Sequence, residues 1–308
     1  MISPLEDLRG LTALAEEAPP ADFEITKEVG FYKLALRRLF RHRMAIIGGV
    51  CLVIVAAVSL LGPILLPASW DQPDLTNRFA SPAWPHIMGT DDLGRDIFRR
   101  IMDGGRVSLS VGLLATVVVI TLGVTMGTLA GYFGGLIDNL MMRFTDAILA
   151  IPSIFLLILL TSGFGHTAPV IVLAIGFTLW TDTARIVRSV VLSVREKEFV
   201  EAARAVGSST PTIIVKHVLT NVLGPIMVAA TLTVGISIIT ESALSYLGLG
   251  IGPPIASWGS MLFSAQQFIW DAPFFALFPG TAIAVTVLSI NFLGDGLRDA
   301  FDPRSFER

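Results

Sequence analysis

The feature that most constrains this chain is a series of apolar runs, each about as long as a lipid bilayer requires, roughly 20 residues. Of its 308 residues, 53% are hydrophobic and only 15% are charged. Soluble domains carry about 25% charged residues, and here the charges fall mostly between the runs. The mean hydropathy is +0.72. We therefore expect an all-α integral membrane protein with six transmembrane helices.

The six predicted spans lie at about residues 44–66, 107–133, 139–162, 168–188, 218–247 and 275–295. A basic stretch precedes the first span, and Pro63 and Pro67 are expected to end it. In the second span, Gly123, Gly127 and Gly131 recur every four residues and so share one helical face. Small residues at this spacing let a second helix approach closely in a membrane. The alternative is that these glycines only permit bending.

The distribution of Lys and Arg predicts the orientation, because cytoplasmic segments of membrane proteins carry an excess of both. With the amino terminus inside, 17 of the 22 Lys and Arg residues fall in inner segments and 5 in outer segments. All five outer ones lie in one long loop, where aspartates offset their charge. Both termini are therefore expected to face the cytoplasm.

The chain divides into four predicted regions: a polar cytoplasmic tail at 1–30, a basic segment with the first transmembrane helix at 31–66, an outer loop with a surface helix at 67–106, and a core of five transmembrane helices at 107–308. The tail is rich in Asp and Glu, so a cleavable signal peptide is not expected. The last outer loop, 248–274, has no Lys or Arg. Such a loop can dip back toward the membrane only if it packs against protein.

Several kinds of chemistry lack the residues that they need. None of the four lysines follows a glycine-rich loop, so no nucleotide-binding P-loop is predicted. The four histidines are scattered, and the single cysteine, Cys51, lies in the first apolar run, where a small buried residue is expected. No basic patch follows the pattern of a phosphate backbone. Catalytic residues, a metal site and nucleic-acid binding are therefore not expected.

Three acidic residues fall inside predicted spans. Asp146 lies in the third, Asp182 toward the inner end of the fourth, and Glu241 toward the outer end of the fifth. Proton-coupled carriers usually place ionisable groups near the bilayer midplane, whereas these three are expected closer to the helix ends. Asp146 and Asp182 are interpreted as structural. For Glu241, a structural and a functional role both stay open.

The inner loop between the fourth and fifth spans, 195–217, is the most informative segment. Its alanines predict a short helix at 198–206, which Gly207 would end. A smooth helix of this kind can enter a groove on a partner, and because it joins two spans, a partner that moves it tilts both. An ordinary amphipathic connector fits the periodicity equally well. The candidate contact residues are Glu201, Ala202, Ala203, Arg204 and Gly207.

Several motifs resemble those of a known family. The segment Glu201-Ala202-Ala203-x-x-x-Gly207 resembles the Glu-Ala-Ala loop of bacterial ABC importer permeases. Within that family the chain most resembles the C-type subunit of dipeptide and oligopeptide permeases, over about residues 31–306. The other matching segments are Gly89-Thr90-Asp91-x-x-Gly94-Arg95-Asp96, Gly131-Tyr132-Phe133-Gly134-Gly135, Glu241-x-x-Leu244-Ser245-Tyr246-Leu247-Gly248-Leu249-Gly250, Ser257-Trp258-Gly259 and Gly294-Asp295-Gly296-Leu297-Arg298-Asp299-Ala300-x-Asp302-Pro303.

One position departs from the family pattern. Thr220 stands where the family commonly has proline. Proline restricts the residue before it, so its absence predicts a more continuously helical join between the inner loop and the fifth span.

The resemblance implies the type I ABC importer permease fold, in the inner membrane of a bacterium, and a division of labour among chains. A second homologous permease subunit would complete the translocation pathway. Two cytoplasmic ATP-binding subunits would grip the coupling helices and use ATP and Mg, neither of which is expected to bind this chain. An extracytoplasmic substrate-binding protein would deliver the substrate. On this reading, Asp91, Arg95, Asp96 and Trp258 are candidates for a binding-protein contact or a gate, and Glu241 and Ser245 for the pathway.

Di- or oligopeptides are the expected substrates, with nickel, glutathione or oligosaccharides as alternatives within the importer class. A secondary carrier is a more distant alternative, which would need an inverted repeat and ionisable groups at the midplane. An intramembrane enzyme would need a nucleophile with a base, or a metal site. The sequence indicates neither arrangement.

Overall fold

The computed structural model describes residues 36–65, 72–252 and 254–301, and the predicted tail at 1–30 lies outside them. The longer helices are α3 (Arg43–Leu65), α4 (Ile97–Phe133), α5 (Gly135–Leu149), α6 (Ser153–Phe164), α7 (Ala168–Val194), α10 (Thr220–Tyr246) and α12 (Pro273–Phe301). The short elements are η2 (Leu75–Asn77), α8 (Glu198–Ala205), α9 (Thr210–Thr212), the π-helical segment η3 (Ile213–Leu219), α11 (Trp258–Ala265) and η4 (Gln266–Phe268). Over these ranges the chain is helical and forms no strand, which confirms the predicted class.

The prediction of six spans agrees with the helices, although several boundaries differ. Among the described residues, five helices are long and apolar enough to cross a membrane, and α5 with α6 makes a sixth span if the two are taken together. The fourth and sixth spans are longer than predicted, because α7 continues to Val194 and α12 to Phe301. Pro63 lies inside α3 instead of ending it, since a proline in a last turn removes only one helical hydrogen bond.

The third predicted span, 139–162, is not one straight helix. α5 and α6 meet at an angle of 83° across residues 150–152. Pro152 stands immediately before the first residue of α6. A proline lacks the N–H that would continue α5, and it disfavours helical geometry in the residue before it. The break therefore follows from Pro152. The apolar run at 139–162 does not reveal this break, because Pro152 is itself apolar.

The predicted surface helix and the second span form a single element. α4 begins at Ile97, where the Asp96 side chain caps it by accepting a hydrogen bond from the Arg99 backbone N–H at 2.7 Å. The helix then continues through Gly104 and Gly105 into the apolar run. A Cβ atom at Gly105 would lie 2.2 Å from the Ser59 side chain, so α3 packs directly on this stretch of α4. The boundary predicted at residue 107 was wrong, because the change from charged to apolar residues does not interrupt the helix.

The three regularly spaced glycines of α4 form the contact face for α7. A Cβ atom would lie 2.7 Å from Thr183 at Gly123, 2.5 Å from the Ala184 carbonyl oxygen at Gly127, and 2.9 Å from the Arg188 carbonyl oxygen at Gly131. Only glycine leaves room for backbones this close. The prediction of a close helix–helix approach is confirmed.

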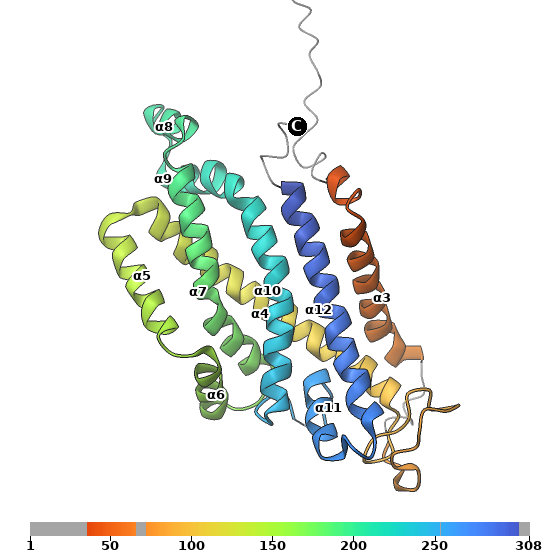
Figure 1. Ribbon diagram of the computed structural model, residues 1–308. Coiled ribbons are helices and arrows are strands. Elements are labelled where there is room, and N and C mark those ends of the chain that lie inside the picture. The colour runs from red at the N-terminus through yellow and green to blue at the C-terminus, as the bar shows by residue number, and fades with distance from the viewer. Residues whose placement is uncertain (1–35, 66–71, 253, 302–308) are drawn as a thin grey trace, which may run out of the picture. The chain divides into compact units, whose positions relative to one another are not determined.

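The remaining helices are laid out side by side, with α8 and α11 at opposite ends (Figure 1). α3 packs on α12 and on α4, and α10 lies between α7 and α12. The exposed side chains of α3 are mostly apolar, as lipid contact requires. Cys51 on α3 is only partly buried, which differs from the expected full burial. The last outer loop does fold back against protein, because α11 buries Trp258, Met261 and Ala265.

The join between the inner loop and the fifth span is helical throughout. Residues 210–246 form a single helix that is long enough to cross a membrane, and the π-helical turn η3 lies inside it. The Thr220 hydroxyl donates to the Val215 carbonyl oxygen, five residues earlier, at 3.3 Å. The continuous join predicted from the absence of proline is therefore confirmed, with a π turn at the position in question.

Candidate functional site

The inner-loop helix α8 has one face turned toward the protein and one toward solvent. Val200 is fully buried, and it belongs to a cluster with Ile213 and Val218 of η3. On the other side, Phe199 is 42% and Val206 86% exposed. Large apolar side chains this exposed on a charged helix indicate a surface that another protein covers.

The five predicted contact residues divide between these two faces. Glu201, Ala202 and Gly207 are exposed, whereas Ala203 is half-buried against the Val200 cluster. The Arg204 guanidinium lies over the Tyr132 ring, 5.4 Å from its centroid, so it holds α8 to the end of α4. The exposed surface of α8 and its C-cap thus includes Phe199, Glu201, Ala202 and Val206, and the two large apolar residues among them were not predicted from the sequence.

Gly207 ends α8 through its backbone conformation. Its φ is +84°, a value that residues with side chains rarely adopt. The Gly207 N–H donates to the Arg204 carbonyl oxygen at 2.9 Å, and the Ser208 N–H to the Ala203 carbonyl oxygen at 3.0 Å. These bonds satisfy carbonyl groups that a helix end would otherwise leave unpaired.

A second contact links the base of α8 to the turn between α4 and α5. The Arg195 guanidinium donates to the Gly131 carbonyl oxygen at 2.8 Å. Nearby, Arg188 of α7 forms two hydrogen bonds with the Asp138 carboxylate of α5. These contacts therefore tie the end of α7, from which the chain continues into α8, to α4 and α5.

The outer-loop candidates Asp91, Arg95 and Asp96 have partners inside the loop. The Asp91 carboxylate is fully buried, accepts from the Arg95 side chain at 2.7 Å, and lies 3.4 Å from Arg100 Nε. The Asp96 carboxylate is also fully buried, and its Oδ2 lies 2.9 Å from His86 Nδ1. Both carboxylates therefore hold the loop in shape and present no surface to a partner in this conformation.

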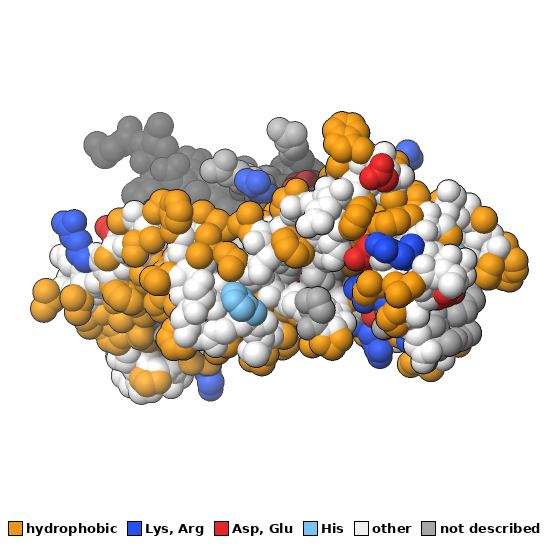
Figure 2. Space-filling view, turned by 90° about the horizontal axis from the view of Figure 1, so that it is seen from below, with side chains coloured by type: hydrophobic (Ala, Val, Ile, Leu, Met, Phe, Trp, Pro, Cys, Tyr) orange, Lys and Arg blue, Asp and Glu red, His pale blue; other side chains and the backbone are white. Residues whose placement is uncertain are grey.

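Glycines at positive φ complete this loop. Gly94 has φ +78°, and a Cβ atom there would lie 1.8 Å from the Asp74 carbonyl oxygen. Gly89 also has φ +78°, and its Cβ atom would lie 2.5 Å from the Ala80 carbonyl oxygen. The motif from Gly89 to Asp96 thus specifies the fold of the loop. Figure 2 shows the end of the molecule that carries it, where charged side chains gather toward one side.

Two exposed tryptophans on the outer segments were not among the candidates. Trp84 is 86% exposed and Trp270 is 93% exposed. Trp258, which was a candidate, is only 1% exposed, and its indole N–H donates to the Ile101 carbonyl oxygen at 2.9 Å. Tryptophan is common both in protein interfaces and at membrane surfaces, so Trp84 and Trp270 are the better placed residues for an outer contact.

Glu241 and Ser245 lie together in a buried cluster of hydroxyl groups. The Glu241 carboxylate has no exposed surface and accepts hydrogen bonds from Ser245 at 2.8 Å and from Ser108 of α4 at 3.1 Å. Ser108 Oγ also accepts the Trp258 backbone N–H at 3.2 Å. The cluster therefore joins α4, α10 and α11, and it opens to no pathway in this conformation.

Asp146 lies near a helix end, as expected, whereas Asp182 does not. Asp146 is in the last turn of α5 and forms an ion pair with Arg185 of α7, with 2.6 Å between Oδ1 and Nη2. Both side chains of the pair are 50% exposed. Asp182 is exposed in the interior of α7. Because α7 continues to Val194, beyond the apolar run that predicted the span, Asp182 lies near the middle of the helix.

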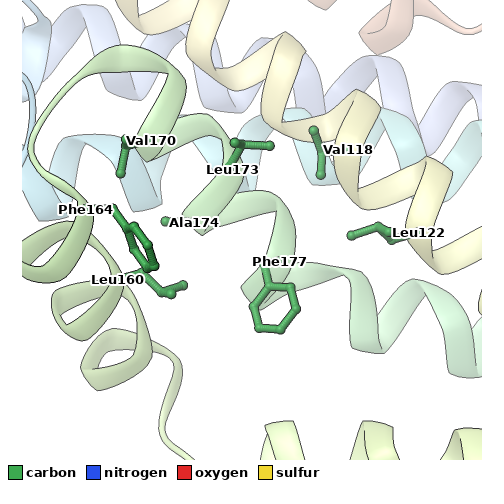
Figure 3. A pocket seen from close by; sticks show the side chains of 8 residues that line it. All are labelled: Val118, Leu122, Leu160, Phe164, Val170, Leu173, Ala174 and Phe177. Atoms are coloured by element: carbon green, nitrogen blue, oxygen red, sulfur yellow. The ribbon is translucent and has the colours of Figure 1, made fainter.

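A wholly apolar recess lies beside α7 on a different face. It has a volume of about 380 Å³ and lies between α4, α6 and α7 (Figure 3). Its lining residues, all labelled there, are Val118, Leu122, Leu160, Phe164, Val170, Leu173, Ala174 and Phe177. None of these side chains can form a hydrogen bond, so the recess suits a lipid chain or an apolar helix and not a peptide. Among the described residues, no group of three or more His, Cys, Asp or Glu side chains is arranged to hold a metal ion.

Comparison with known proteins connects this architecture to one family. The family described as binding-protein-dependent transport system inner membrane component matches residues 123–307. The N-terminal transmembrane domain of oligopeptide transport permease C matches residues 30–82.

Relatives match over nearly the whole chain. A dipeptide transport system permease protein, DppC, of Alkalihalophilus pseudofirmus is 40% identical over 97% of this chain and 98% of its own length. An oligopeptide transport system permease protein, OppC, of Bacillus subtilis is 37% identical, covering 94% and 95%. The OppC of Escherichia coli is 41% identical, covering 88% and 90%.

Proposed function

This chain belongs to the family of binding-protein-dependent transport system inner membrane components, and we propose that it supplies half of the translocation pathway of an ATP-driven peptide importer. It is a multi-pass inner membrane protein with the type I ABC permease fold. Its relatives are dipeptide and oligopeptide permeases, which favours peptides over nickel, glutathione or oligosaccharides.

The proposal assigns the energy input to other chains. Two cytoplasmic ATP-binding subunits hydrolyse ATP with Mg, a second permease subunit completes the pathway, and an extracytoplasmic binding protein delivers the peptide. Both termini of this chain face the cytoplasm. The exposed Trp84 and Trp270 are the proposed points of contact with the binding protein.

The observation that carries the coupling role is the exposed surface of α8. Its small Ala202 can approach a groove closely, its Phe199 and Val206 gain by burial, and Glu201 can form an ion pair at the rim. The buried side of α8 is fixed by Val200 and by the Arg204–Tyr132 contact. A force on α8 therefore reaches the membrane helices without being lost in a flexible loop.

Reversing the charge at Glu201 tests this proposal. Glu201→Arg should lower ATP-driven dipeptide uptake in proteoliposomes at least tenfold, because the arginine meets the ATP-binding subunit with the wrong charge. The purified complex should elute at the wild-type position in size-exclusion chromatography, since Glu201 supports nothing inside this chain.

Glu196→Arg is the matched control. Glu196 is exposed and lies just before α8, with only a 3.7 Å contact to Arg195. Its variant should transport within about twofold of wild type. If Glu201→Arg takes up dipeptide at the wild-type rate, the coupling role is rejected. If uptake by the unmutated complex depends on a proton gradient and not on ATP, the result supports a secondary carrier instead.

A further inference from the structure

The inner half of α7 carries an exposed stripe that is mostly polar. Asp182, Arg185, Ser189 and Ser193 follow one another at helical spacing and are all exposed, and Ile186, 46% exposed, lies among them. On the same side of the helix further out, Ile171 and Ile175 have no exposed surface and Thr178 has 5%. One side of α7 is thus sealed by protein in its outer half and open in its inner half.

The stripe begins deep in the membrane. Asp182 lies about 12 residues from the inner end of α7 at Val194, which is roughly 18 Å along the helix. Asp182 is thus close to the midpoint of α7, and the middle of a helix that crosses the roughly 30 Å apolar core of a bilayer lies far from water on either side. The Asp146 carboxylate, in the last turn of α5, reaches Arg185, which is one turn from Asp182 on α7.

Charges at this depth are too costly to face lipid. A single ionised side chain at the centre of a membrane helix costs about 2.5–3.5 kcal/mol on insertion scales. Arg185 and Asp146 offset each other's charge, although each side chain is still half exposed. No hydrogen bond or ion pair joins Asp182 to any other described residue. This face must therefore meet water or another protein.

We propose that this stripe lines the water-filled translocation pathway, and that Asp182 is the carboxylate that meets the ammonium group of the passing peptide. The inference rests on the proposed importer function and adds to it the residues that the substrate passes. A peptide with free termini carries both signs of charge. Asp182 offers an unpaired negative charge for the ammonium group, whereas Arg185, within a helical turn of it, is already paired with Asp146.

The arrangement also explains why one side of α7 is buried in its outer half and exposed in its inner half. The sealed outer half, packed in a cluster with Val111, Leu157 and Leu244, would close the pathway to the outside. The open inner half would admit water from the cytoplasm. This is the geometry of an inward-facing state.

Cysteine accessibility in the assembled transporter tests the proposal. Cys51 is the only cysteine of the chain, so a Cys51→Ala background allows single cysteines to be placed at Asp182, Ser189 and Leu173. Leu173 is 59% exposed but lies in the apolar recess, which makes it the matched lipid-side control. Inside-out membrane vesicles are treated with a cationic, membrane-impermeant methanethiosulfonate, and labelling of this chain is measured with and without ATP plus vanadate.

Asp182→Cys and Ser189→Cys should label at least tenfold faster than Leu173→Cys without nucleotide, and ATP plus vanadate should slow them at least fivefold. Labelling after denaturation shows that each cysteine is present. Rates at positions 182 and 189 no faster than at 173, in both nucleotide states, would mean that lipid or the second permease covers this face, and the proposal would be wrong.

Uptake then tests the role of the charge. Asp182→Asn should lower the uptake of a dipeptide with free termini at least fivefold, and Asp182→Glu should restore most of it. Wild-type uptake by Asp182→Asn would reject the contact with the ammonium group. Labelling needs no substrate and tests only whether the stripe lines a water-filled pathway. ATP-driven uptake by the unmutated complex tests the importer function itself, so the two proposals can fail separately.

Discussion

At the scale of single residues, Glu241 is the least expected feature of the molecule. A carboxylate with no exposed surface is normally paired with a cation, yet Glu241 accepts hydrogen bonds from serine hydroxyls. One of them, Ser108, is 133 positions away in the chain and also binds the backbone of α11. Glu241 therefore joins three elements in this conformation, which favours the structural one of its two open roles.

Removing this carboxylate should destabilise the complex. Glu241→Ala leaves buried hydroxyl donors without an acceptor, at about 1–3 kcal/mol for each, and also opens a cavity. We expect a clear fall in the melting temperature of the purified complex, measured by tryptophan fluorescence in detergent. Thr240→Ala is the control, because Thr240 is only half-buried and its hydroxyl bonds to the Ile236 carbonyl oxygen of the same helix. Equal melting temperatures for the two variants would contradict this role.

The same scale accounts for the outer-loop candidates. Asp91 and Asp96 belong to a motif that resembles other permeases, and that resemblance suggested a contact with a partner. In the structure they are buried beside arginine and histidine side chains, so reversing either charge would disrupt the loop before it tested any contact. The exposed tryptophans 84 and 270 are the cleaner targets.

At the scale of elements, the close packing of α4 on α7 is the main helix–helix contact of the fold. The glycine face of α4 brings the two backbones into contact over about two helical turns, from Gly123 to Gly131, and α7 continues directly into the inner loop. A rigid pair of this kind allows a displacement of α8 to reach the outer half of the protein. The break between α5 and α6 and the π turn before α10 are the places where the flanking helices can adjust.

A methyl group on the glycine face should force α4 and α7 apart. Gly127→Ala places a Cβ atom 2.5 Å from the Ala184 carbonyl oxygen, and overpacking of this kind costs about 1–3 kcal/mol. Gly49→Ala on α3 has no atom within 4 Å of the new methyl group, so it should be neutral or slightly stabilising. The melting temperatures of the two variants in detergent are the measurement. A Gly127→Ala variant as stable as Gly49→Ala would show that the contact is not tight.

At the scale of the whole molecule, α8 and α11 lie at opposite ends of the described helices (Figure 1). The excess of Lys and Arg predicts that α8 lies on the cytoplasmic side, and α11 with the Gly89–Asp96 loop on the other. Under the proposed function, the ATP-binding subunits would act at the first end and the substrate would arrive at the second.

Reporter fusions test this orientation. Alkaline phosphatase, which folds only outside the cytoplasm, should be inactive when fused after Arg308 and active when inserted after Gly252 in the last outer loop. Green fluorescent protein fused after Arg308 should be fluorescent. The opposite pattern of phosphatase activity would reverse the orientation and remove α8 from the side where ATP is available.

What the sequence by itself determined are the features set by local pattern. The apolar runs predicted the spans, Ala202 and Gly207 predicted the extent of α8, and the spacing of three glycines predicted the face of α4 that packs most closely. Each depends on neighbours within a few helical turns. The motifs added the family, which the comparisons confirm.

Only the tertiary structure decided which polar residues are buried and which are open. Asp91 and Asp182 are both aspartates, yet one is sealed among arginines and the other is exposed in the middle of a span. The difference lies in what packs against each of them from distant parts of the chain. Periodicity along one helix contains no information about those partners, because burial is a property of the assembled bundle and not of the segment.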